Sequence, residues 1–161
     1  MVWFNSRMCA IRYHREMGGE KTMKIKAKPV STGIAEGEAI VSSMPISFTG
    51  GMDPDTGVIR EKGHELEGQS VANKILVFPT GKGSTTGSWQ FYAAYKRGHA
   101  PKGIINQKAE GVVAVSAIIT GTPMVHEPEA DLLELIKTGD FVRINADAGF
   151  VEIRKKGDEG G

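Results

Sequence analysis

A short glycine-rich segment holds the densest group of reactive side chains in this sequence. Residues 81–88 are Gly-Lys-Gly-Ser-Thr-Thr-Gly-Ser, and they lie between a predicted strand and a predicted helix. Hydroxyl groups and free backbone N–H groups at a helix N-terminus bind anions, because the helix dipole places partial positive charge there. Lys82 adds a full positive charge. The segment therefore predicts a site for a carboxylate or a phosphate.

A nucleotide site and a simple helix cap are the alternatives to this anion site. A nucleotide-binding P-loop needs a glycine, four further residues and then Gly-Lys-Ser or Gly-Lys-Thr. Here Gly83 separates Lys82 from Ser84, which excludes a P-loop. In the second alternative Ser84 is only the N-cap of the helix, and the glycines only form the turn. Spacing alone favours the cap, but three glycines, two serines, two threonines and a lysine within eight residues exceed what one cap requires.

The elements on either side must position this segment. Residues 72–78 end in the apolar run Ile-Leu-Val-Phe before Pro79, which predicts a buried strand. After the segment, residues 89, 92, 93 and 96 (Trp, Tyr, Ala and Lys) recur at helical spacing, and Gly98 ends the predicted helix. The local unit is therefore a strand, a glycine turn and a helix.

Strands and helices also alternate along the rest of the chain. The apolar residues 109–120 predict a buried helix, although their valines and isoleucines leave a strand open. A strand-rich start and end around this alternation predict a single α/β domain with a layered β/β/α plan. The other predicted elements are strands at 23–30, 38–41, 102–106 and 122–125, a turn at Gly33 and Gly37, a helix at 129–138 closed by Gly139, and a hairpin of 141–145 with 149–154.

A long segment rich in glycine, aspartate, proline and serine covers residues 47–68. It predicts an irregular loop, and loops of this length inside a compact domain are usually functional. The segment is thus a candidate surface for a substrate or a partner. Simple turn chemistry from its Asp-Pro and glycine residues explains the composition equally well.

Composition limits the classes of function. The chain has 161 residues, of which 40% are hydrophobic, and this suits one well-buried core. Its formal net charge of +1 gives no field that would attract nucleic acid or an anionic membrane. The apolar stretch 111–119 is shorter than the roughly 20 residues that span a bilayer. We therefore expect a soluble, cytoplasmic protein with no nucleic-acid or membrane partner.

The chain has few residues of the types that hold metals. Cys9 is the only cysteine, and the four histidines do not fall at the spacing that places two ligands on one helix face. We expect no metal site in this chain. Residues 1–22 are expected to be a disordered extension or to reflect a wrongly assigned start, with the domain at 23–154 and a flexible tail at 155–161.

The segment 81–88 resembles the active-site loop of the aconitase X swivel-domain family. The stretches 46–57, 68–70, 100–101 and 104–106 also resemble motifs of this family, in the same order, so that the resemblance covers about residues 23–153. It implies a swivelling β/β/α domain, the small subunit of a hydro-lyase. A [4Fe-4S] cluster would be carried by an aconitase-like large subunit and not by this chain, in a heterodimer or a larger assembly.

The resemblance also implies roles for individual residues. Ser84 matches the serine that accepts the substrate proton, and donors at the helix N-terminus would have to stabilise its alkoxide. Ordinary aconitases follow this serine with a serine and a carboxylate-binding arginine, whereas Thr85 and Thr86 follow here. The predicted substrate contacts are Lys82, Gly83, Thr85, Thr86, Ser88, Gly50, Gly51 and Asn106.

Three functions stay open for such a chain. The resemblance to family members of this length implies that the substrate is a phosphorylated hydroxy acid. The reaction would be dehydration of (R)-5-phosphomevalonate to trans-anhydromevalonate 5-phosphate in the archaeal mevalonate pathway of isoprenoid synthesis. Other members imply dehydration of cis-3-hydroxy-L-proline. A non-catalytic anion-binding or interaction domain is the alternative from another class.

Residues 112–152 show a second resemblance, to the mobile phosphohistidine domains of phosphoenolpyruvate-using enzymes. Those domains carry their phosphate on a histidine two residues before an Ala-Ile pair, and this chain has Val115 at that position. Phosphotransfer from that position is excluded. The likeness supports only the swivelling β/β/α plan.

Overall fold

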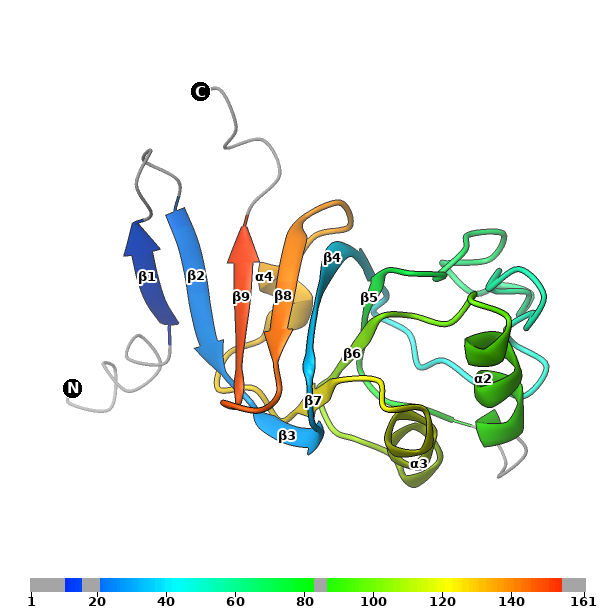
Figure 1. The fold of residues 1–161 in the computed structure, drawn as a ribbon. Coiled ribbons are helices and arrows are strands. Elements are labelled where there is room, and N and C mark those ends of the chain that lie inside the picture. The colour runs from blue at the N-terminus through cyan, green and yellow to red at the C-terminus, as the bar shows by residue number, and fades with distance from the viewer. Residues whose placement is uncertain (1–10, 16–20, 83–86, 155–161) are drawn as a thin grey trace.

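The computed structural model describes residues 11–15, 21–82 and 87–154 (Figure 1). This part of the chain forms nine strands and three helices. The strands are β1 (Ile11–Arg15), β2 (Lys21–Lys26), β3 (Lys28–Ser31), β4 (Ile34–Val41), β5 (Ile75–Phe78), β6 (Gly103–Asn106), β7 (Met124–His126), β8 (Phe141–Asn145) and β9 (Phe150–Arg154), and the helices are α2 (Gly87–Lys96), α3 (Gly111–Thr120) and α4 (Leu132–Leu135).

All nine strands belong to one sheet, in the order β1-β2-β9-β8-β4-β5-β6-β7-β3. In this order β1, β2, β9, β8 and β4 pair antiparallel, and β4, β5, β6 and β7 pair parallel. At the far edge β3 pairs antiparallel with β7. Strand β4 joins the two halves, because Ile34–Glu38 pair with β8 and Ala39–Val41 pair with β5. In Figure 1 the antiparallel half and the two longer helices lie at opposite ends of the molecule.

Two hydrophobic cores lie on the two faces of the parallel strands. Ile75 and Val77 of β5 pack into a core with the antiparallel strands and α4, and Leu76 and Phe78 pack into a core with α2 and α3. All four side chains are buried. Burial on both faces is typical of a central parallel strand. The predicted α/β fold with β/β/α layers is therefore confirmed, and residues 72–78 contain the predicted buried strand.

The helix predicted at 129–138 is much shorter in the structure. Only Leu132–Leu135 are helical, and Ile136 is extended. The backbone N–H of Glu129 donates to the Lys26 carbonyl (2.9 Å), and the Lys137 N–H donates to the Asp140 carboxylate (2.9 Å). A longer helix would use the Lys137 N–H for a bond to the Leu133 carbonyl. At the other end Asp131 is the N-cap, because its carboxylate accepts from the Leu133 N–H (3.1 Å). The predicted length was therefore wrong at both ends.

Two further predictions differ from the structure. Part of the expected extension at residues 1–22 is a strand, since β1 pairs antiparallel with β2 through Ile11–Ile25 and the pairs that follow. Gly37 lies inside β4, opposite Val142, and not in a turn. Gly33 does lie in a turn, with a φ of +123°. The domain boundaries at residues 22 and 154 stay predictions.

Helix α2 confirms the helix predicted after the glycine-rich segment, but its buried positions are not those of the predicted stripe. Gly87, Phe91 and Ala94 face the core, whereas Trp89 is 74% exposed. Gly98 follows the helix with a φ of +78°, as expected. The spacing of apolar residues in the sequence therefore predicted the helix but not which of its faces is buried.

Helix α3 settles the choice between helix and strand for residues 109–120. Glu110 caps its N-terminus, and Gly121 in the left-handed region ends it. Val113 and Ala117 are buried, but the side chains of Val115, Ile118 and Ile119 are half exposed. The expectation that this helix is buried was wrong for its outer face. No described helix has the length and apolar character to cross a membrane.

The predicted irregular loop at 47–68 is packed against the core. Phe48, Met52, Ile59 and Leu66 are buried within it and join the core beside α2. Buried His64 accepts at Nδ1 from the Leu66 N–H (3.1 Å), so its Nε2 carries the proton that it donates to the Pro45 carbonyl (3.1 Å). The loop is irregular in backbone and fixed in position.

Glu65 attaches this loop to the end of β4. Its carboxylate accepts from the Ser42 hydroxyl (2.6 Å), from the Ser43 backbone and hydroxyl groups, and from the Met44 N–H (3.2 Å). The Ser42 hydrogen bond first, and the bonds from Ser43 and Met44 with it, outweigh the opposing effect of burial and lower the pKa of Glu65 below its usual 4.5. The ionised form is therefore favoured in the folded state.

We expect Glu65→Gln to lower the free energy of unfolding by about 1 kcal/mol at neutral pH, because a charge-assisted hydrogen-bond network is weakened at a solvent-exposed position. A lowered pKa stabilises the fold above the unfolded pKa, and this stabilisation is lost as the pH falls through the folded pKa. The difference between wild type and variant should thus be present above pH 4.5 and shrink below it. Urea denaturation across this pH range measures it. Glu67→Gln is the control, and a pH-independent difference would contradict the assignment.

Candidate active site

The glycine-rich segment is described at its two ends. Gly81 and Lys82 follow β5, and Gly87 and Ser88 form the start of α2. The predicted site residues Gly83, Ser84, Thr85 and Thr86 lie outside the described residues, and so does the proposed N-cap role of Ser84. The structure therefore shows what holds the segment at its entry and its exit.

The entry to the segment is held by the residues that follow β6. The Asn106 side chain donates from Nδ2 to the Phe78 carbonyl (3.1 Å), and the Gln107 and Lys108 N–H groups both donate to the Pro79 carbonyl (3.0 and 3.2 Å). Phe78 and Asn106 are also paired in register. The hydrogen bonding between the two segments thus continues beyond β5 and β6 and holds Pro79, the first residue after β5.

The opposite side of the entry is held by Ile46, which precedes the long loop. Its N–H donates to the Thr80 carbonyl (3.3 Å), and its carbonyl accepts from the Lys82 N–H (3.1 Å). Ile46 is itself buried. The backbone of Lys82 is consequently fixed by a buried neighbour, whereas its side chain remains 45% exposed.

Helix α3 comes so close to Gly81 that any larger residue would force neighbouring side chains to move. A Cβ atom on Gly81 would lie 2.3 Å from Val113 Cγ2 and 2.9 Å from Glu110 Oε2. Glu110 is held in place because its carboxylate accepts from the Val112 and Val113 N–H groups at the helix N-terminus. The glycine is therefore required by close packing and does more than permit a turn.

The predicted contact residues Gly50 and Gly51 form a tight turn beside the segment. Gly50 has a φ of +71°, and a Cβ on Gly51 would lie 2.1 Å from the Ser47 carbonyl oxygen. At the exit of the segment, a Cβ on Gly87 would lie 3.1 Å from Thr49 Oγ1. The turn at 47–51 therefore adjoins the start of α2, where Ser88 also lies.

Asn106 is completely buried at the base of the segment. Its Nδ2 is bonded to Phe78, but among the described residues its Oδ1 has no hydrogen-bond partner. An unpaired buried acceptor costs about 1–3 kcal/mol. The Asn106 amide group thus contacts the carbonyl from which the segment starts, and its role as a substrate contact stays a prediction.

Lys82 forms an ion pair that the sequence did not predict. Its Nζ lies 2.5 Å from Glu61 Oε1, and the two side chains are 45% and 29% exposed. No sequence pattern marks Glu61, because its approach to Lys82 depends on the packing of the irregular loop. Glu110 was missed for a different reason, since glutamate is not among the preferred N-cap residues.

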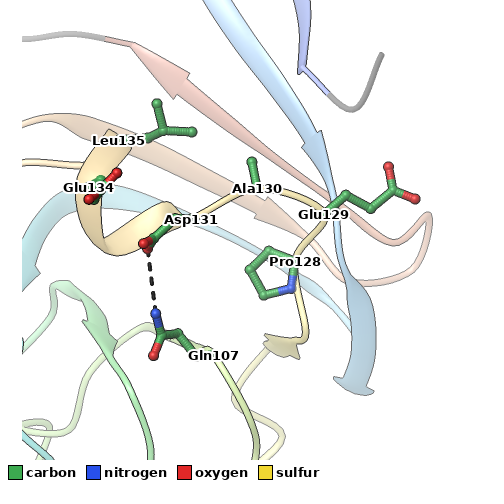
Figure 2. Close-up of a pocket in the computed structure, with 7 residues that line it drawn as sticks. All are labelled: Gln107, Pro128, Glu129, Ala130, Asp131, Glu134 and Leu135. Carbon is green, nitrogen blue, oxygen red and sulfur yellow. Dashed lines mark hydrogen bonds between the residues drawn. The ribbon is translucent and has the colours of Figure 1, made fainter. Parts of the chain in front are cut away.

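A cleft of about 590 Å³ lies at another place, between the residue after β6 and the segment that leads into α4. Figure 2 shows Gln107 and Asp131 facing each other across it, with Gln107 Nε2 3.4 Å from Asp131 Oδ1. Glu129 and Glu134 also line it. Three carboxylates would repel an anionic substrate, so this cleft does not replace the glycine-rich segment as the candidate site.

The comparison with known families decides which family this arrangement represents. The family "Aconitase X swivel domain" matches residues 24–153, which is nearly all of the described chain. The chain belongs to the aconitase X swivel domain family. The predicted resemblance is therefore confirmed.

Individual relatives match the sequence of this aconitase X swivel domain over almost their full length. The phosphomevalonate dehydratase small subunit of Thermococcus gammatolerans is 53% identical over 131 residues, covering 81% of this chain and 98% of the relative. That of Methanosarcina mazei is 46% identical and covers 84% and 94%. The crystal structure of Thermococcus kodakaraensis aconitase X in its holo form has a TM-score of 0.78 and 50% identity, covering 82% of this chain and 98% of that one.

The residues of this swivel domain do not fit an iron–sulfur cluster. Such clusters are usually held by several cysteine thiolates, and the sequence has one cysteine. Within the described residues, no three His, Cys, Asp or Glu side chains are grouped in a way that could hold a metal ion.

We expect Gly81→Ala to destabilise the swivel domain by about 1–3 kcal/mol, because the added methyl group overlaps the Val113 side chain. Removing the obstructing methyl groups should relieve the overlap, so the cost of Gly81→Ala should be smaller in a Val113→Ala background. Thermal or urea denaturation of the four variants measures this coupling. Gly111→Ala is the control, since nothing lies within 4 Å of a Cβ there. Equal costs in both backgrounds would contradict the packing argument.

Proposed function

We propose that this chain is the small subunit of a phosphomevalonate dehydratase, a hydro-lyase that converts (R)-5-phosphomevalonate to trans-anhydromevalonate 5-phosphate. The observation that carries this proposal is the agreement with the small subunits of that name, at 46–53% identity over nearly their whole length. The helix N-terminus that follows a lysine-bearing turn is suited to a substrate with a phosphate and a carboxylate.

Ser84 is proposed as the proton acceptor of this reaction. It would take the proton from the carbon next to the substrate carboxylate, while the hydroxyl on the neighbouring carbon leaves as hydroxide and takes up a solvent proton to become water. Ser84 would then return the proton that it accepted to solvent before the next turnover. A serine hydroxyl is a weak base in water, so its alkoxide needs nearby donors. The start of α2 at Gly87 supports this role, because the N–H groups of the first turn and the helix dipole favour negative charge there.

The residues around Ser84 are proposed to bind the substrate and to fix the segment. Lys82 has a fixed backbone and a half-exposed ammonium group, which suits the phosphate. Gly50, Gly51 and Ser88 adjoin the same end of α2, and the Asn106 side chain donates to the Phe78 carbonyl, from which the segment starts. Gly83, Thr85 and Thr86 complete the proposed contacts.

A large, aconitase-like subunit is proposed as the partner, and the proposed [4Fe-4S] cluster belongs to it. Two observations support a partner: the relatives are named small subunits, and the residues of this chain do not fit such a cluster. One subunit would then supply the serine and the other the cluster. Turnover would require both chains.

We expect the two-chain complex, prepared without oxygen, to dehydrate 5-phosphomevalonate, and each chain alone to be inactive. Ser84→Ala should lower kcat by at least about a hundredfold, the lower range for loss of a general base, and should leave complex formation intact by gel filtration. Ser43→Ala is the control, since this exposed serine lies outside the segment and bonds to Glu65.

Three outcomes would contradict parts of this proposal. A formed complex with an intact cluster and no turnover would exclude 5-phosphomevalonate, and cis-3-hydroxy-L-proline would be the next substrate to assay. Loss of complex formation in Ser84→Ala would favour the cap role of this serine. Binding of anions with no turnover of either substrate would favour a non-catalytic domain.

A further inference from the structure

An acidic side chain forms an ion pair with the lysine that is proposed to bind the substrate phosphate. Glu61 Oε1 lies 2.5 Å from Lys82 Nζ, although the two residues come from different loops. We infer that Glu61 is an internal competitor for Lys82, whose carboxylate the substrate phosphate has to displace before it can bind there. This inference rests on the proposed function and adds to it a contact within the chain that weakens phosphate binding.

The backbone on both sides holds Glu61 in place. The Glu61 carbonyl accepts from the His64 N–H (3.2 Å), and the Arg60 N–H donates to the Gly51 carbonyl (2.8 Å). Ile59, two residues earlier, is buried in the core beside α2. The carboxylate is therefore presented to Lys82 by a packed loop.

Within the described part of the chain, Lys82 is the only partner of the Glu61 carboxylate. Oε1 is bonded to Lys82, while Oε2 is buried and has no hydrogen-bond partner among the described residues. The neighbouring Arg60 is paired instead with Asp53 (2.5 Å). An anion that draws Lys82 away removes the one described partner of this carboxylate, so Glu61 opposes that displacement.

The cost of this displacement is small. An ion pair with partially exposed partners changes an equilibrium by about fivefold or less. A phosphate monoester carries nearly two negative charges at neutral pH, so it attracts the Lys82 ammonium more strongly than the single charge of Glu61 does. The Glu61–Lys82 pair thus weakens binding of the phosphate group about fivefold or less without preventing it.

The experiment compares Glu61→Gln, Lys82→Met and the double variant in the two-chain complex. Glu61→Gln should lower the KM for 5-phosphomevalonate and the inhibition constant of inorganic phosphate about two- to fivefold, with kcat unchanged. Inhibition by mevalonate, which lacks the phosphate, should not change. In the Lys82→Met background, Glu61→Gln should have no effect. Asp55→Asn is the control, because Asp55 belongs to the same loop and pairs with Arg97 instead.

Several results would overturn the inference. A higher KM in Glu61→Gln would mean that Glu61 positions Lys82 productively, and an effect that persists in Lys82→Met would mean that Glu61 acts on the substrate directly. Glu61→Asp, which shortens the side chain by one methylene, provides the same comparison if Glu61→Gln does not fold. If the wild-type complex does not turn over 5-phosphomevalonate, the proposed function fails, and calorimetric titration of the same complexes with inorganic phosphate still tests the competition.

Discussion

Burial of both faces of β5 is the constraint on which the rest of the structure depends. Its four side chains alternate between a core formed with the antiparallel strands and a core formed with α2 and α3. Because both faces are covered, the strand cannot shift by one residue without placing every side chain in the wrong core. The chain therefore leaves β5 at one defined point, and the turn that follows starts from a fixed carbonyl.

The parallel pairing of β5 with β6 also fixes the position of the chain where the candidate site begins. Asn106 ends β6 opposite Phe78 and donates to its carbonyl, and the next two residues hold Pro79. Ile46 and the N-terminus of α3 close the other sides of the entry. Three elements distant in sequence thus converge on residues 78–82, which is the kind of rigid support that precise placement of a catalytic side chain requires.

The parts of this structure that depend on local sequence were predicted, and those that depend on distant contacts were not. The apolar run before Pro79 predicted β5, and the glycine-rich turn before a helical spacing predicted α2. The extent of α4 was also wrong, although the Asp131 and Asp140 carboxylates, which accept from the Leu133 and Lys137 N–H groups at its two ends, are close in sequence. Gly81 was recognised as part of a turn, but the need for glycine comes from α3. Glu61 could not be found because its position depends on how the long loop packs, and the roles at 83–86 still rest on family resemblance.

Helix α3 has a consequence for handling the protein. Its outer face carries the half-exposed Val115, Ile118 and Ile119, and the helix contains no charged residue from Gly111 to Thr120. Aliphatic side chains grouped on a surface without charged neighbours promote self-association as concentration rises. Dilute working stocks and salts of low salting-out strength are therefore the appropriate conditions for preparing this chain.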